Sequence, residues 1–150
     1  MIDLKDIKKL RSLTKAGIMD CRKALRQTQG DFNKAKKYLK EKSMAIAAKK
    51  KDRETKTGLI EAYIHNGSQV GAIIKLSCET DFVARTKEFK QLAHELAMQT
   101  AAMKPKNVEE LLEQEYIRDS EKKIKDLVQE VIGKVGENIR IEEISRLEIG

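Results

Sequence analysis

The fold of this chain is decided by residues 58–85, which read GLIEAYIHNGSQVGAIIKLSCETDFVAR. From Leu59 to Ile64 the residues alternate with the two-residue period of a strand, and a second β-prone run extends from Val70 to Cys78. The pair Asn66-Gly67 lies between the two runs and is typical of a type I′ turn. The segment therefore predicts an antiparallel hairpin over 58–78.

A helical pattern follows the hairpin directly. Thr80 is a good helix N-cap and Asp81 suits a first turn. The positions that mark one apolar helix face up to about Met103 are Phe89, Leu92, Ala93, Leu96 and Ala97. The only proline, Pro105, ends this helix.

The rest of the chain predicts more helix and one more strand. Residues 107–132 read as one or two further helices, so we expect helices over 81–132, and Gly133 and Gly136 bracket a turn. The segment 139–149 is rich in β-branched residues with an uneven alternation, which indicates a bulged final strand. The region 57–150 is thus expected to be α+β, with a three-stranded antiparallel sheet packed by helices on one face. The other face needs cover, so burial alone favours dimerisation through the sheet.

The first third of the chain has a different pattern. Three short helices are expected within 1–42, separated by a break at 14–17 and by Gly30, with Asp3 and Asp31 as caps. Such a small unit is usually an interaction module. The segment 43–56 becomes a run of charge and is interpreted as a basic linker.

Charge divides the chain at the same place. Residues 1–56 hold 18 Lys and Arg against 7 Asp and Glu, a net charge of +11, whereas residues 57–150 hold 13 against 17, a net charge of −4. A basic segment invites an acidic partner. The alternative interpretation is therefore an RNA-associated or ribosome-associated protein that uses residues 1–56. No aromatic residue accompanies the basic run Lys49–Lys51, and a solvated helix face and linker explain most of the lysines, so we expect no direct nucleic-acid partner.

No residue pattern predicts catalysis or a cofactor. His65 and His94 are the only histidines, and they have no spacing that predicts a nucleophile with its base. No glycine-rich phosphate loop is present, so we expect no bound nucleotide. Cys21 and Cys78 lack partners at metal spacing and are expected to be free buried thiols. With no signal peptide and no apolar run long enough to span a membrane, the sequence predicts a cytosolic protein with no metal and no membrane partner.

Phe82 has two interpretations. It precedes Phe89 by seven residues, so helical periodicity alone places its ring in the core. Alternatively, as a residue of the first helical turn after a strand, it projects from the edge of the domain.

The segment Thr80-Asp81-Phe82-Val83-Ala84 after a hairpin strand resembles the signature of the elongation factor Ts family. The likeness extends over nearly the whole chain. It includes Leu10-Arg11, Ala16-Gly17, Met19-Asp20-Cys21, Lys23-Ala24-Leu25, Gly30-Asp31, Ala47-Ala48-Lys49-Lys50, Leu96-Ala97-Met98 and Gly136-Glu137-Asn138-Ile139. Lys15 and Ile18 depart from the family pattern, and the stretch from about Lys104 to Lys125 is shorter than in the family.

The resemblance implies a function and a site. Members of the family are guanine-nucleotide exchange factors for elongation factor Tu. In them an Asp-Phe pair inserts between helices of the partner and disturbs its magnesium and phosphate binding, so that GDP leaves. The resemblance assigns this role to Asp81 and Phe82, with Thr80 and Val83 fixing the turn. No covalent bond changes in such an exchange, so the chain is not expected to be an enzyme.

The resemblance also implies contacts elsewhere. The N-terminal helices correspond to a ubiquitin-associated-like domain that docks on the partner, with Arg11, Ile18 and Met19 as candidate contacts. His65 and the pair Val135-Gly136 match positions near the partner's nucleotide domain. Only one core unit is present, and short members of the family form homodimers through their sheets, so we expect a homodimer.

Overall fold

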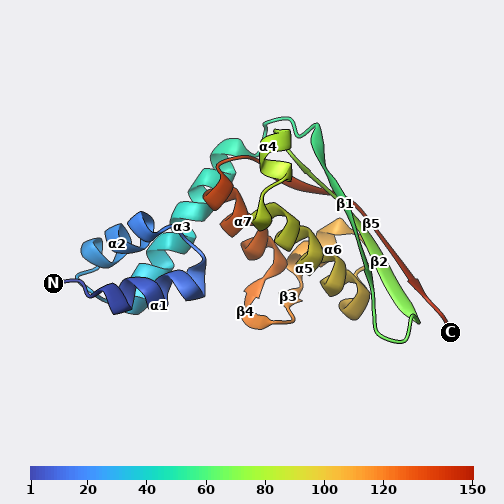
Figure 1. The fold of residues 1–150 in the computed structure, drawn as a ribbon, viewed down its shortest axis with the longest axis horizontal. Helices are drawn as coiled ribbons and strands as arrows, with labels where there is room; N and C mark the ends of the chain where they lie inside the picture. The colour runs from blue at the N-terminus through green and yellow to red at the C-terminus, as the bar shows by residue number, and fades with distance from the viewer.

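The computed structural model describes residues 1–150 and shows an elongated molecule with a helical unit at one end and a sheet at the other (Figure 1). The N-terminal unit consists of three helices: α1 (Leu4–Thr14), α2 (Ile18–Gln27) and the first half of α3 (Phe32–Lys50). The side chain of Asp3 accepts a hydrogen bond from the Lys5 N–H, and that of Asp31 accepts one from the Lys34 N–H. Both predicted caps are therefore present.

Helix α3 is longer than the sequence predicted. The segment 43–56 was expected to be a linker, but its first part is the second half of α3, and only residues 51–56 lie between α3 and the first strand. The reason is tertiary packing, since Ala47 belongs to the hydrophobic core of the sheet unit and Ile46 packs against it. Gly133 permits the close packing of α3 on the sheet unit, because a Cβ atom at this position would lie 2.7 Å from Ser43 Oγ. A rigid helix thus joins the two units.

The sheet unit, residues 57–150, contains the predicted three-stranded antiparallel sheet. Its strands are β1 (Thr57–Ile64), β2 (Val70–Cys78) and β5 (Ile139–Glu148), in the order β1-β2-β5. The expected bulge is in β5, where Glu142 is the extra residue between Ile141, which pairs with Leu76, and Glu143, which pairs with Lys75. The hairpin turn differs from the predicted type I′ turn, because its positive φ angles fall at Gly67 and Ser68 instead of Asn66 and Gly67.

Helices cover one face of this sheet (Figure 1). The single helix expected from Asp81 to Met103 is divided into a short α4 (Asp81–Ala84) and a long α5 (Lys87–Met103). Two hydrogen bonds explain the break: the Thr86 hydroxyl donates to the Val83 carbonyl at 2.7 Å and accepts from the Phe89 N–H at 3.3 Å. Thr86 therefore caps a new helix, and α4 is free to take its own direction.

The region 107–132 is also less helical than expected. It contains α6 (Val108–Glu113), a small hairpin of β3 (Glu115–Tyr116) and β4 (Asp119–Lys123), and the start of α7 (Ile124–Val135). The fully buried Gln99 of α5 explains the hairpin, since its amide donates to the Glu115 carbonyl and accepts from the Ile117 N–H, both at 3.0 Å. Gly133 lies within α7, so the predicted turn begins only at Gly136.

The two units have separate hydrophobic cores of unequal size. The core of the sheet unit contains 18 buried residues, and that of the N-terminal unit contains 7. Each fully buried large apolar side chain contributes about 1.5–3 kcal/mol to stability, so the sheet unit has the larger reserve. No helix combines the length and the apolar character that crossing a membrane requires.

Candidate functional site

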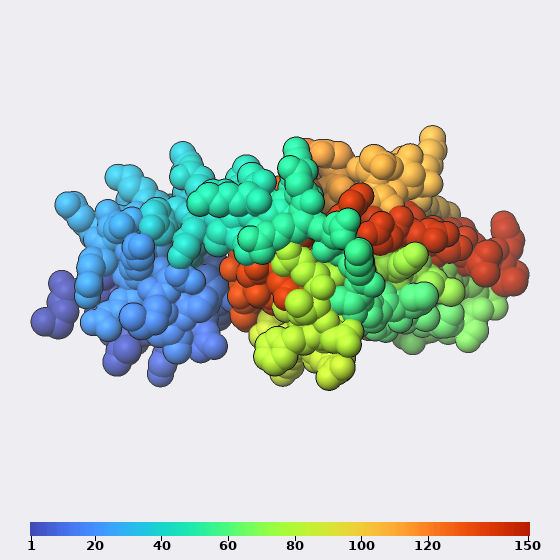
Figure 2. Space-filling view, turned by 90° about the horizontal axis from the view of Figure 1, so that it is seen from above, coloured from blue at the N-terminus to red at the C-terminus, as the bar shows by residue number.

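The most exposed aromatic ring of the chain lies on α4, directly after β2. Phe82 is 82% exposed, whereas its neighbour Val83 is buried in the core. Thr80 caps the helix, because its hydroxyl accepts a hydrogen bond from the Val83 N–H at 3.3 Å. The interpretation of Phe82 as a core residue is therefore wrong: the helix that would have turned its ring inward ends at Ala84. In Figure 2 the yellow-green region that contains α4 protrudes from the surface.

Two residues from distant segments hold α4 in place. The Glu137 carboxylate accepts from the Thr80 N–H at 2.9 Å through one oxygen and from the Thr80 hydroxyl at 2.7 Å through the other. The hydroxyl of Thr57, the first residue of β1, donates to Asp81 at 2.6 Å. Arg85 adds an exposed ion pair to Asp81 at 3.4 Å. The backbone before the exposed ring is thus fixed from two sides.

Cys78 also contacts the turn at Thr80. Its buried thiol donates to the Thr80 carbonyl at 3.2 Å, and burial raises the pKa of the thiol from 9.0 to about 11. The negative charge of Glu137 contributes to this rise in the pKa, although less than burial does. At neutral pH the side chain is therefore a neutral thiol that acts as a hydrogen-bond donor.

The turn after α7 brings another pair of predicted residues close to α4. Gly136 ends the helix at a φ of 76°, a left-handed conformation that favours glycine, and the next residue is Glu137. Val135 and Gly136 are partly exposed, and Glu137 joins them to Thr80. Asn138 is buried, and its amide donates to the carbonyls of Lys51 and Arg53. The turn therefore organises both α4 and the chain segment that leads into β1.

A second exposed apolar group lies in the N-terminal unit. Ile18 and Met19, in the first turn of α2, are 51% and 71% exposed, and Arg11 is an exposed residue of α1. Helix α2 begins after Gly17, which provides no side-chain hydrogen bond to the helix. This group is held by the packing of α2 on the small core beneath it and by an ion pair between Asp20, in the same helical turn, and Lys42 of α3.

His65 lies apart from both groups. It follows the last residue of β1, while Thr57 at the other end of the strand contacts Asp81. An eight-residue strand is roughly 25 Å long, so His65 is distant from α4. Its Nδ1 atom lies 3.0 Å from the hydroxyl oxygen of Tyr63. The structure thus brings Val135 and Gly136 close to α4 but leaves His65 at the far end of the sheet.

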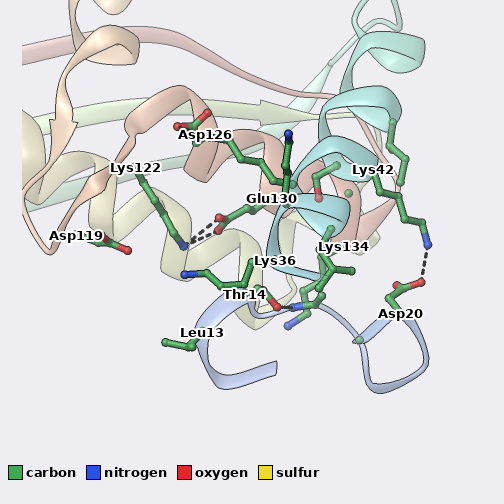
Figure 3. A pocket seen from close by; sticks show the side chains of 18 of the residues that line it. Leu13, Thr14, Asp20, Lys36, Lys42, Asp119, Lys122, Asp126, Glu130 and Lys134 are labelled. Atoms are coloured by element: carbon green, nitrogen blue, oxygen red, sulfur yellow. Dashed lines mark hydrogen bonds and ion pairs between the residues drawn. The ribbon is translucent and has the colours of Figure 1, made fainter. Parts of the chain in front are cut away.

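A highly charged cleft of the molecule contains none of the predicted site residues. It has a volume of about 340 Å³ and lies between the N-terminal unit, α7 and β4 (Figure 3). Six lysines and five acidic residues are among the side chains that line it: Lys36, Lys37, Lys40, Lys42, Lys122, Lys134, Asp20, Asp119, Glu121, Asp126 and Glu130. Several are already paired with each other, as in the 2.9 Å contact between Lys122 and Glu130. This charge balance does not favour either an anionic or a cationic ligand.

Sequence reasoning missed Glu137 and Thr57 as site residues. Each contacts α4 across a long stretch of sequence, so no local periodicity reveals it. The only signal for Glu137 is its place in the Gly136-Glu137-Asn138-Ile139 motif. No group of three or more His, Cys, Asp or Glu residues is placed to hold a metal ion. The candidate site consists of an exposed ring on a fixed turn and a second exposed apolar group on a separate unit.

Known proteins resemble this chain over nearly its whole length. Residues 79–150 match the family model described as Elongation factor TS. The elongation factor Ts of Thermotoga neapolitana is 42% identical to the chain over 187 positions, which cover 96% of this chain and 95% of the relative. That of Herpetosiphon aurantiacus is 41% identical, covering 99% and 98%, and that of Caldanaerobacter subterraneus subsp. tengcongensis is 40% identical, covering 100% and 98%.

The relatives are longer than this chain. The alignment with the Thermotoga protein spans 187 positions whereas the chain has 150 residues, so at least 37 positions of the alignment have no residue here. The likeness nevertheless covers both the N-terminal unit and the sheet unit, and it includes α4 and the turn that holds it. The chain belongs to the elongation factor Ts family.

Proposed function

We propose that this protein is a guanine-nucleotide exchange factor for elongation factor Tu and that it inserts Asp81 and Phe82 into that partner. The observation that carries the proposal is the ring of Phe82, which is 82% exposed on a turn fixed by Thr80, Thr57 and Glu137. An exposed aromatic residue on a rigid support is the kind of anchor that dominates protein interfaces. The rigid support also reduces the entropy that is lost on binding.

Insertion explains GDP release without covalent chemistry. A GTPase holds its nucleotide through phosphate contacts and a magnesium ion, whose oxygen ligands need near-ideal octahedral geometry. A side chain that displaces the elements carrying those ligands weakens the binding of the nucleotide. Phe82 supplies the bulk for this displacement, and Asp81 supplies a negative charge next to the phosphate site. The protein would act in the cytoplasm, where elongation takes place, and it would not be an enzyme.

The N-terminal unit would dock on the partner. Ile18 and Met19 offer an exposed apolar group, and Arg11 offers a charge on the neighbouring helix. Val135 and Gly136 lie next to the support of α4 and would contact the partner beside the inserted ring. His65, at the other end of the sheet, would make a separate contact.

The exchange assay tests this function. Purified elongation factor Tu is loaded with fluorescent GDP, and its release is followed with and without the factor. We expect wild type to accelerate release. We expect Phe82→Ala to reduce the acceleration at least about thirtyfold, which corresponds to a hot-spot contribution of about 2 kcal/mol. Because the ring is exposed, the variant should remain folded.

The matched control is Met103→Ala, which removes another exposed apolar side chain at the end of α5. It should leave the exchange rate unchanged. A folded wild type that does not accelerate GDP release would overturn the proposed function. Full activity of Phe82→Ala would overturn the assignment of the inserted residue.

We also propose that two copies of the chain associate through the open face of the sheet. The register places Ile73 of the central strand beside Ala62 and Ser145, and Leu147 beside Gly71, which itself pairs with Ile64. The large apolar residues that are exposed on this face are Ile60, Ile64, Ile73 and Leu147. Light scattering at micromolar concentration and physiological salt should give the mass of a dimer, and Ile73→Lys should give a monomer. A wild-type monomer would contradict this part of the proposal.

A further inference from the structure

We propose that Glu137 is a positioning residue for nucleotide exchange, which fixes the turn that presents Phe82 without itself being required to touch the partner. The inference rests on the proposed exchange function. Glu137 follows the turn at the end of α7, 57 residues after Thr80, and both of its carboxylate oxygens accept hydrogen bonds from that residue.

Helix α4 needs such an external anchor. It has four residues, far fewer than the roughly 12–15 that an isolated helix needs to be even marginally stable in water. Burial of Val83 fixes its depth, but the direction of the first turn depends on the backbone at Thr80. The Glu137 carboxylate binds the N–H and the hydroxyl of that residue together, which fixes the backbone and the capping side chain at the same time.

The hydrogen bonds that the Glu137 carboxylate accepts both come from Thr80. No Lys or Arg nitrogen lies within 4.0 Å of it, so no ion pair competes with the two hydrogen bonds to Thr80. Both contacts are hydrogen bonds to a charged acceptor, the stronger kind in proteins. Thr57 makes a single bond to the exposed Asp81, and that bond leaves the Thr80 backbone untouched. The Cys78 thiol, a weak donor, makes one bond to the Thr80 carbonyl. Glu137 is therefore the main polar anchor of the turn.

Loss of Glu137 should affect the insertion step. Without the anchor, the turn must become ordered while Phe82 enters the partner, and this cost falls on the transition state for GDP release. Docking through Ile18 and Met19 lies on another unit and does not depend on α4. We therefore expect Glu137→Ala to lower the maximal rate of GDP release about tenfold or more, since a hydrogen bond to a charged group is worth at least about one decade. The half-saturating concentration of the factor should change less than about threefold.

A double-mutant cycle separates positioning from a general structural role. Stopped-flow release of fluorescent GDP is measured for Glu137→Ala, Phe82→Ala and the double variant, each over a range of factor concentrations. If Glu137 acts through the ring, Glu137→Ala should cost less than about twofold once Phe82 is removed. If Phe82→Ala leaves no measurable acceleration, Phe82→Leu takes its place in the cycle.

Two further variants complete the design. Glu121→Ala removes the same charge from an exposed position on β4 and should behave as wild type. Glu137→Gln keeps an oxygen that accepts from the Thr80 N–H, and it should fall between wild type and Glu137→Ala. Thermal unfolding by circular dichroism checks the fold of each, and if Glu137→Ala does not fold, the cycle is run with Glu137→Gln.

Two results would overturn the inference: a folded Glu137→Ala with the wild-type maximal rate, or a loss that persists in full without Phe82. Both require an active wild type. An inactive wild type would instead indicate that the proposed function is wrong, so the two failures are distinguishable.

Discussion

Two of the exposed apolar groups of this protein, Phe82 and the pair Ile18-Met19, lie in the first turn of a helix, but their supports differ. Phe82 stands on a four-residue helix whose start is fixed by hydrogen bonds that Thr57 and Cys78 donate and that Glu137 accepts. Ile18 and Met19 stand on the ten-residue α2, which has no side-chain cap and rests on a core of seven buried residues.

This difference agrees with two different tasks. A side chain that must enter a partner at one position benefits from a support that cannot turn away. A docking group can adjust to a surface, and a separate small unit permits such adjustment. A buried cysteine lies close to each group, Cys21 within α2 and Cys78 before α4, so the chain contains an internal probe of each support.

We expect the largest effect from a substitution that unfolds the N-terminal unit, which supports Ile18 and Met19. Leu10 is fully buried in the core of the N-terminal unit, so Leu10→Ala should cost about 3 kcal/mol, enough to unfold a unit with so little core. Urea unfolding followed by circular dichroism at 222 nm should show the loss of the N-terminal helices. In the exchange assay, the half-saturating concentration should rise about tenfold as one of two linked contacts is lost, while the maximal rate stays within about twofold.

Leu4→Ala is the matched control, because it makes the same substitution at an exposed position on the same helix. Its effect on stability should be below about 0.5 kcal/mol. If Leu10→Ala instead abolished the maximal rate, the two supports would not be independent. Helix α3, which joins the two units, would then transmit the change from one support to the other.

We expect the next largest effect in the reactivity of the two buried cysteines, which compares the stability of the two supports. Burial raises the pKa of both thiols, that of Cys78 to about 11. At pH 8 a thiol with that pKa is about 0.1% thiolate, against roughly 9% for a cysteine at the ordinary pKa of 9.0, so a thiol reagent attacks mainly after local opening. Because the smaller core should open more readily, we expect Cys21 to react about tenfold faster than Cys78.

Labelling with a chromogenic disulfide reagent at pH 8 measures both rates, and the single variants Cys21→Ala and Cys78→Ala assign them. Glu137→Ala should accelerate labelling of Cys78 and leave that of Cys21 unchanged, because only the Cys78 thiol contributes to the Thr80 turn. Equal rates for the two cysteines in wild type would contradict the idea that the supports differ in stability.

The sequence predicted those elements whose signals are local. The hairpin over 58–78, the caps at Asp3, Asp31 and Thr80, and the bulged last strand all depend on neighbouring residues, and all are present. Elements that depend on distant partners were predicted less well. The second half of α3 is helical because Ala47 meets the core of the sheet unit, and the hairpin of β3 and β4 exists because Gln99 binds its backbone.

The same rule applies to the candidate site. Periodicity placed Phe82 in the core because it could not detect Thr86 as a second cap that divides the helix. The role of Glu137 depends on a contact across 57 residues, and a single sequence gives no physical signal for such a contact. The resemblance to a family indicated which residues are exposed, but the hydrogen bonds that support them had to come from the structure.

The smallest expected effect adds to α2 the cap that it lacks. Gly17 has a φ of −64°, which any residue adopts, and a Cβ atom there would meet only Asp20 Oδ2 at an ordinary 3.7 Å. In Gly17→Ser, the new hydroxyl can accept from the free N–H groups of the first turn, which should stabilise the N-terminal unit by about 0.5 kcal/mol. Gly30→Ser is the control, because Gly30 has a φ of 83° and the same substitution should cost about 1 kcal/mol there. The midpoints of urea unfolding should show both the stabilisation by Gly17→Ser and the destabilisation by Gly30→Ser. If the capped variant were more stable and its half-saturating concentration for exchange rose clearly, the uncapped start of α2 would itself contribute to docking, and adaptability of this group would be a property that the partner requires.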